Sequence, residues 1–126
     1  SSCRVPNLEA PECTAARQSV RAFYSFHFGN EMRFSAENLR PREKFLTPRF
    51  AESLRNQQTE ADVFTTGDTD YPKAFSAGEC RVLAPDKTEF DVLLFWKDDT
   101  RTEQRKIKVE AVKQNDVWLI DKIIQK

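Results

Sequence analysis

Residues 105–123, RKIKVEAVKQNDVWLIDKI, contain the pattern that decides the fold. In the first half of this stretch, Ile107, Val109 and Ala111 alternate with charged side chains, as in a strand with one buried face. The polar residues KQND interrupt the alternation, and a second apolar run begins at Val117. Two strands joined by so short a turn must be antiparallel, because parallel neighbours need a long crossover. The stretch therefore predicts the last hairpin of an antiparallel sheet.

Two earlier segments extend this sheet toward the N-terminus. Residues 89–96, EFDVLLFW, place four large apolar side chains on one face of a strand. Because Leu93 and Phe95 on the other face are also apolar, we expect that face to be covered as well. Residues 73–84, KAFSAGECRVLA, predict a further strand with a bulge at Gly78. The connecting segments are short and polar, so the prediction is a meander of consecutive antiparallel strands.

Helical periodicity precedes the strands. Apolar side chains recur at helical spacing over 15–28, which predicts a helix from Ala15 to Phe28 with Thr14 as its N-cap. A shorter helix is predicted to begin at Pro48, with Thr47 as its N-cap, and to end near Gln57. Helices followed by a run of strands indicate an α+β fold, with the helices packed on one face of a curved antiparallel sheet. We expect a single domain over 14–126, preceded by a tether or processed segment over 1–13.

The charge balance argues against a nucleic-acid partner. Lys and Arg together number 20, as do Asp and Glu, so the chain has no excess of the positive charge that phosphates attract. No apolar run approaches the roughly 20 residues that span a bilayer. The basic clusters LRPREK (39–44) and RTEQRKIK (101–108) are interleaved with acids, and we expect both to be solvated. Three glycines exclude a Gly-rich phosphate loop, and we expect no cofactor and no metal.

Three cysteines, Cys3, Cys13 and Cys80, leave the redox state open. In the first interpretation Cys3 is a lipid-modified anchor, since SSC resembles the small residues before a lipoprotein cysteine, and Cys13 pairs with Cys80. In the second, Cys3 pairs with Cys13 and Cys80 is a buried thiol. In the third, all three are reduced in a cytoplasmic protein. The compartment separates these alternatives. A signal peptide would lie upstream of Ser1.

The order of these elements, and the closing motif VKQNDVWLIDKI, resemble the nuclear-transport-factor-two-like superfamily of cone-shaped (cystatin-like) α+β proteins. The segment DVF…GDTDYP followed by VLLFW is similar to a branch of uncharacterised bacterial envelope proteins and lipoproteins. The resemblance covers about residues 14–126 and implies a cavity between the helices and the concave sheet. It implies no particular function, because this superfamily includes enzymes, transport factors and binding modules. No catalytic motif of its enzymes is matched here.

The first candidate site is the acidic segment DVFTTGDTDYP, residues 62–72. Asp62, Asp68 and Asp70 could ligate calcium, but the spacing lacks the alternating ligands and final Glu of an EF-hand loop. Asp and Thr side chains also bind nearby backbone N–H groups in turns, and Gly67 can take a positive φ. We therefore expect a hydrogen-bonded bend between the helical and strand halves of the chain.

The second candidate is His27, the only histidine and so the only side chain with an ordinary pKa near neutrality. It lies beside the apolar stripe of the first helix. A general base needs a positioned partner, for which Asp68, Asp70 and Asp91 are candidates. The simpler interpretation is a hydrogen-bonded histidine without a catalytic role.

The third candidate is a hydrophobic pocket. Most of the aromatic side chains should form the core. If a pocket exists, its walls are best supplied by side chains that combine an apolar body with a polar tip or lie beside such residues. The candidate ligand-binding residues are Tyr24, His27, Phe64, Tyr71 and Trp96.

These observations favour a non-enzymatic binding module of the bacterial envelope, periplasmic or outer-envelope, for a small apolar ligand or a protein partner. Binding would use the helix–sheet cavity or the open face of the sheet, in a monomer or a homodimer. The alternatives are a small acid–base enzyme of isomerase or dehydratase type that uses His27, and a partner-specific inhibitor or immunity protein. A cytoplasmic location is the alternative to export.

Overall fold

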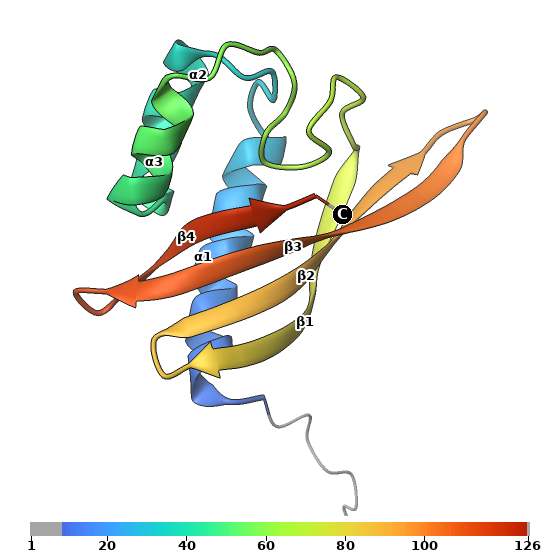
Figure 1. Ribbon diagram of the computed structural model, residues 1–126. Helices are drawn as coiled ribbons and strands as arrows, with labels where there is room; N and C mark the ends of the chain where they lie inside the picture. The colour runs from blue at the N-terminus through green and yellow to red at the C-terminus, as the bar shows by residue number, and fades with distance from the viewer. Residues whose placement is uncertain (1–8, 126) are drawn as a thin grey trace, which may run out of the picture.

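The computed structural model describes residues 9–125, which form helices followed by one antiparallel sheet (Figure 1). This order confirms the predicted α+β class. In chain order, the elements are α1 (Pro11–Phe28), α2 (Ala36–Leu39), the 3₁₀ helix η1 (Arg40–Phe45), α3 (Pro48–Arg55), β1 (Ala74–Ala84), β2 (Lys87–Lys97), β3 (Thr102–Gln114) and β4 (Val117–Ile124).

The four strands form a meander in the order β1-β2-β3-β4, with every pair antiparallel. The β3–β4 turn consists of Asn115 and Asp116, whose φ angles of 54° and 65° give the positive values that two-residue hairpins require. The register of β1 shifts between Ala77 and Cys80, so the bulge lies where Gly78 predicted it. A Cβ on Gly78 would lie 3.0 Å from the backbone oxygen of Asp91 on β2, which is why glycine suits this position.

Helix α1 crosses the inner face of the sheet, while α2, η1 and α3 lie beyond the edge of the sheet that β4 forms (Figure 1). The edge of β4 is covered in part, because the chain before α3 pairs Leu46 with Ile120 and the N–H of Thr47 donates to the Ile120 carbonyl. Thr47 also caps α3, accepting from the N–H of Phe50 at 3.1 Å, as predicted. The outer edge of β1 has no strand beside it among the described residues.

The core between α1 and the sheet is built from apolar and aromatic side chains. Its centre is an aromatic cluster in which Phe23 contacts Tyr24, Phe45 and Phe64 at centroid distances of 4.8 to 5.5 Å. The inward residues of β2 and β3, Phe90, Val92, Leu94, Trp96, Ile107, Val109 and Ala111, close it from the other side. The space under the cone is therefore filled by side chains.

Several boundaries differ from the sequence predictions. Helix α1 begins at Pro11 rather than Ala15, and its N-cap is Ala10 rather than Thr14. Proline suits the first helical turn because its φ is preset and its missing N–H has no partner there. Residues 11–13 consequently belong to the domain rather than to a tether, and Cys13 is buried. The short helix α2, capped by Ser35, lies in a segment that was predicted to be a polar link.

The second face of the sheet also differs from expectation. α1 lies on the inner face, and the described residues place no helix over the outer face of β2 (Figure 1). Leu93 and Phe95 are half-buried there without a helix over them among the described residues. Apolar character on both faces of a strand therefore did not indicate a second layer in this chain.

Candidate functional site

His27 is enclosed, and its partner is Asp62 rather than Asp68, Asp70 or Asp91. Its Nε2 lies 2.8 Å from Oδ2 of Asp62, and both side chains are 1% exposed. Arg42 reaches the other ring nitrogen of His27 and is itself 2% exposed, although its cluster LRPREK was expected to be solvated. A general base must reach its substrate. Because this pair is sealed within the protein, the structure offers no support for the acid–base enzyme.

The carboxylates of the acidic segment point to separate partners, so they do not converge on a calcium ion. Asp62 faces inward to His27, and it also accepts from the N–H of Phe64 and the hydroxyl of Thr65. Asp68 accepts from the hydroxyl of Thr66 and from the N–H of Asp70.

Outside these turn contacts, Asp70 binds Arg101 and the indole N–H of Trp96. Gly67 has a φ of 78° within the same segment. The residues therefore form the hydrogen-bonded bend that their types predicted. In the part of the chain that the structure describes, no three His, Cys, Asp or Glu side chains are grouped to hold a metal ion.

The proposed pocket residues lie mostly in the packed core. Tyr24, Phe64 and Trp96 are at most 2% exposed. The hydroxyl of Tyr24 donates to the Phe64 carbonyl at 2.7 Å, and burial raises the pKa of this phenol well above its ordinary value. Tyr71 is half-buried and donates to the Glu60 carbonyl. Of the candidate residues, Tyr24, His27, Phe64 and Trp96 thus fill the cone instead of lining an open cavity, because aromatic rings from α1 and the bend pack into its centre.

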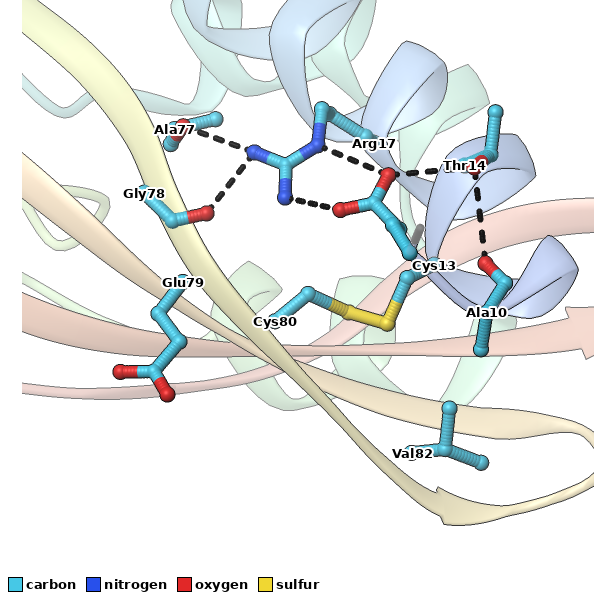
Figure 2. A pocket seen from close by; sticks show the side chains of 10 residues that line it. Ala10, Cys13, Thr14, Arg17, Ala77, Gly78, Glu79, Cys80 and Val82 are labelled. Carbon is cyan, nitrogen blue, oxygen red and sulfur yellow. Dashed lines mark hydrogen bonds and ion pairs between the residues drawn. A yellow bond between two sulfur atoms is a disulfide. The ribbon is translucent and has the colours of Figure 1, made fainter. Parts of the chain in front are cut away.

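An open site lies elsewhere, along the outer edge of β1. A hollow of about 1030 Å³ separates the first turns of α1 from the strand (Figure 2). The residues that line it are Glu9, Ala10, Cys13, Thr14, Arg17, Ala77, Gly78, Glu79, Cys80 and Val82. A second hollow shares Arg17 and Ala77 with the first and continues to Phe75. We call the two together the α1–β1 groove.

A disulfide fixes the two walls of the α1–β1 groove to each other. Cys13 on α1 is bonded to Cys80 on β1, with 6.0 Å between their Cα atoms (Figure 2). This is the pairing of the first interpretation of the cysteines, and it excludes both the Cys3–Cys13 bond and three free thiols for this structure. Cys3, the expected lipid anchor, lies outside the described residues.

Arg17 is the central charged residue of the groove, although no sequence pattern singled it out. It lies one helical turn after Cys13, so the disulfide brings it beside the β1 bulge. One guanidinium nitrogen donates to the carbonyls of Ala77 and Gly78, both at 2.8 Å. The other two nitrogens bind the Glu9 carboxylate, and this hydrogen-bonded pairing holds the pKa of Glu9 below its ordinary value.

The far end of the groove is apolar and open. Val82 is 42% exposed beside Cys80, the half-buried partner in the disulfide, and the next residue, Leu83, is 49% exposed. Val82 lines the groove, whereas Leu83 is not one of its lining residues. The groove therefore combines a free strand edge, an apolar end and two guanidinium groups, Arg17 beside the bulge and Arg21 one turn further along α1.

Comparison with solved structures supports the fold. A protein of unknown function from Bacteroides thetaiotaomicron VPI-5482 matches with a TM-score of 0.60 and 22% identity, over 87% of this chain and 88% of that one. An Ntf2 like protein involved in plasmid conjugation matches with a TM-score of 0.54 and 12% identity, over 95% of this chain and 41% of that one. No protein-family profile and no curated protein sequence matches the chain. The fold is therefore nuclear-transport-factor-two-like.

Proposed function

We propose that this nuclear-transport-factor-two-like domain is a non-enzymatic binding module that holds an extended segment of a protein partner in the α1–β1 groove. The observation that carries the proposal is a contrast in accessibility. The interior under the cone is occupied by buried aromatic side chains, whereas the groove beside β1 is open. We therefore favour a protein partner bound in the groove over a small apolar ligand bound under the cone.

The edge of β1 suits an extended segment because its outer backbone groups have no strand partner among the described residues. Adding a strand to such an edge gives main-chain hydrogen bonds, and neighbouring pockets select alternate side chains. Val82 offers an apolar contact at one end, and α1 forms the second wall. Arg17 already binds two carbonyls at the bulge, which leaves the half of β1 that follows Gly78 as the pairing surface.

We propose that the domain resides in an oxidising compartment of the bacterial envelope, with Cys3 as a lipid anchor. The Cys13–Cys80 disulfide supports this location, because such bonds persist outside the reducing cytoplasm. None of the helices among residues 9–125 is long and apolar enough to cross a membrane. Lipid attachment predicts that the protein made in its native cell sediments with membranes and that Cys3→Ser releases it. An unchanged distribution would contradict the anchor.

Selection from a random peptide library displayed on phage tests the groove. We expect enriched peptides to shift the amide resonances of residues 77–84 and of the first turns of α1. The matched variants are Val82→Glu, inside the groove, and Leu83→Glu, at the adjacent exposed residue outside the groove lining. Val82→Glu should abolish binding and Leu83→Glu should preserve it. Failure to enrich any peptide, or shifts confined to another surface, would overturn the proposed function.

A further inference from the structure

Arg17 presents two different sides to the groove (Figure 2). One nitrogen is held by the backbone carbonyls of Ala77 and Gly78, and the guanidinium carbon lies 5.1 Å from the ring centroid of Phe90. These contacts fix the plane of the group from the strand and from the core below it. The other side of the fork faces Glu9, whose carboxylate it binds through two nitrogens. Arg17 is thus a preset carboxylate receptor, filled here by the chain itself.

The Glu9 carboxylate is held by two residues of α1, Arg17 and Thr14. Glu9 precedes α1 and is partly exposed, and beyond Arg17 its carboxylate accepts only the Thr14 hydroxyl, at 3.2 Å, among the described contacts. Moving the Glu9 side chain into water breaks no backbone bond of α1 or β1. Arg17 would keep both carbonyl contacts while a different carboxylate took the vacated side. Replacing the Glu9 carboxylate by a partner carboxylate leaves the charge beside Arg17 unchanged. The new contacts along the edge of β1 can therefore supply the free energy of binding.

We propose that the partner segment carries a carboxylate that replaces Glu9 on Arg17, so that Glu9 acts as an internal competitor for the groove. This inference rests on the proposed function and names the chemistry of its partner. The planar guanidinium fork binds a carboxylate through two parallel hydrogen bonds, which sets the register of the segment along β1 as well as its charge.

Other charges on the groove favour a single acid over a polyanion. Glu79 lies on the same wall with a side chain that is 74% exposed, and it would repel a chain of phosphates. In the hollow that Glu79 lines, Arg17 is the only guanidinium group and matches one carboxylate, whereas Arg21 lines the second hollow, toward Phe75. The expected partner is therefore an extended peptide with one acidic side chain, or a C-terminal carboxylate, placed about three or four strand residues from an apolar contact with Val82, because Gly78 and Val82 are four residues apart on β1.

The experiment compares peptides from the phage selection with copies in which each Glu or Asp is changed to Gln or Asn. Calorimetry on the disulfide-bonded protein gives the affinities. We expect one acidic position to matter, with a loss of about five- to tenfold on its neutralisation. In Arg17→Met the acidic and neutralised peptides should bind equally. Glu9→Gln should raise the affinity for the acidic peptide about two- to fivefold, because an exposed ion pair of modest strength no longer competes.

The control for Glu9→Gln is Glu12→Gln, which removes the same charge three residues away and outside the groove lining. It should leave the affinity unchanged. If Arg17→Met proves unfolded by thermal denaturation, the comparison of Glu9→Gln with Glu12→Gln decides alone. Peptides that bind in the groove without any dependence on an acidic residue or on Glu9 would overturn this inference and leave the proposed function standing. A library that yields no groove binder would overturn both.

Discussion

Nε of Arg42 donates a hydrogen bond to Nδ1 of His27 at 2.8 Å, deep between α1 and η1. Because a guanidinium group keeps its protons, Nδ1 must be an acceptor, and the ring is neutral with its proton on Nε2. That proton is donated to Asp62, whose carboxylate is 2.8 Å away. The cluster thus contains one buried positive charge and one buried negative charge, joined by a neutral ring. The only histidine of the chain is a structural bridge.

The first prediction concerns the protonation of this bridge. Nitrogen-15 spectra of the imidazole should show a protonated Nε2 and an unprotonated Nδ1 at neutral pH. The reason is geometric, because the Arg42 N–H group occupies the lone pair of Nδ1 and leaves Nε2 as the nitrogen that carries the proton. A spectrum with both ring nitrogens protonated at pH 7 would contradict the assignment.

The second prediction concerns the energy of the same cluster. Asp62→Asn leaves the Arg42 charge buried without its counter-charge, and we expect the free energy of unfolding to fall by about 3 kcal/mol. Glu60→Gln is the matched control, because Glu60 lies only two residues before Asp62 and forms an exposed ion pair with Arg33. Its effect should stay below about 0.5 kcal/mol. Equal losses in urea denaturation of the two variants would show that the buried charges are not what stabilises this segment.

The fold was predictable because its signals are local. The alternation before and after Asn115-Asp116, and the Thr47-Pro48 start of α3, each depend on a few adjacent residues. The partner of His27 was not predictable, since Asp62 is 35 residues away and is one of three similar carboxylates in its segment. Nor could composition tell a filled cone from an open one, because the aromatic residues Tyr24 and Phe64 serve either arrangement equally well.

The groove was missed for a related reason. Arg17 looks like any solvated residue of a helix until Cys13 is paired with Cys80. Only that pairing, which the sequence left as one of three alternatives, places the guanidinium beside the β1 bulge. Binding sites formed between distant segments depend on such long-range connections, and no local periodicity reports them.

The third prediction concerns the disulfide, which closes a sequence separation of 67 residues. A loop of that length restricts the unfolded chain enough to contribute about 4 kcal/mol in the chain-entropy treatment. Reductant, or the double change Cys13→Ala and Cys80→Ala, should therefore lower the free energy of unfolding by roughly that amount. Intact mass should rise by two hydrogens on reduction. Cys3→Ser is the control and should leave the denaturation midpoint in place. A midpoint unaffected by reductant would refute the stabilising role.

The fourth prediction concerns the bulge of β1. In Gly78→Ala the new methyl group would lie 3.0 Å from the backbone oxygen of Asp91, and backbone yields less readily than a side chain. We expect a loss of about 1–3 kcal/mol in the free energy of unfolding, as for overpacked sites. Ser76→Ala, an exposed position on the same strand, should change it by less than about 0.5 kcal/mol. Stability unchanged by Gly78→Ala would mean that the bulge moves freely, and the wall of the groove with it.

The fifth prediction concerns acid. Arg81 donates to Asp91 at 2.6 Å on the outer face of the sheet, and this hydrogen bond holds the pKa of Asp91 below its ordinary value. A depressed pKa contributes stability above the pKa of the unfolded state, and that contribution is lost as the pH falls through the folded-state pKa. Asp91→Asn should therefore destabilise the protein at pH 7 and much less near pH 2.

The control for this variant is Asp99→Asn, which removes the same charge from the exposed β2–β3 loop. Urea denaturation from about pH 7 to pH 2 measures both. The unfolding free energy of Asp91→Asn should vary less with pH than that of the unaltered protein, whereas Asp99→Asn should follow the unaltered curve. Parallel curves for all three proteins would show that the Arg81–Asp91 pair adds nothing to folding. They would also mean that acid destabilises this domain through other carboxylates.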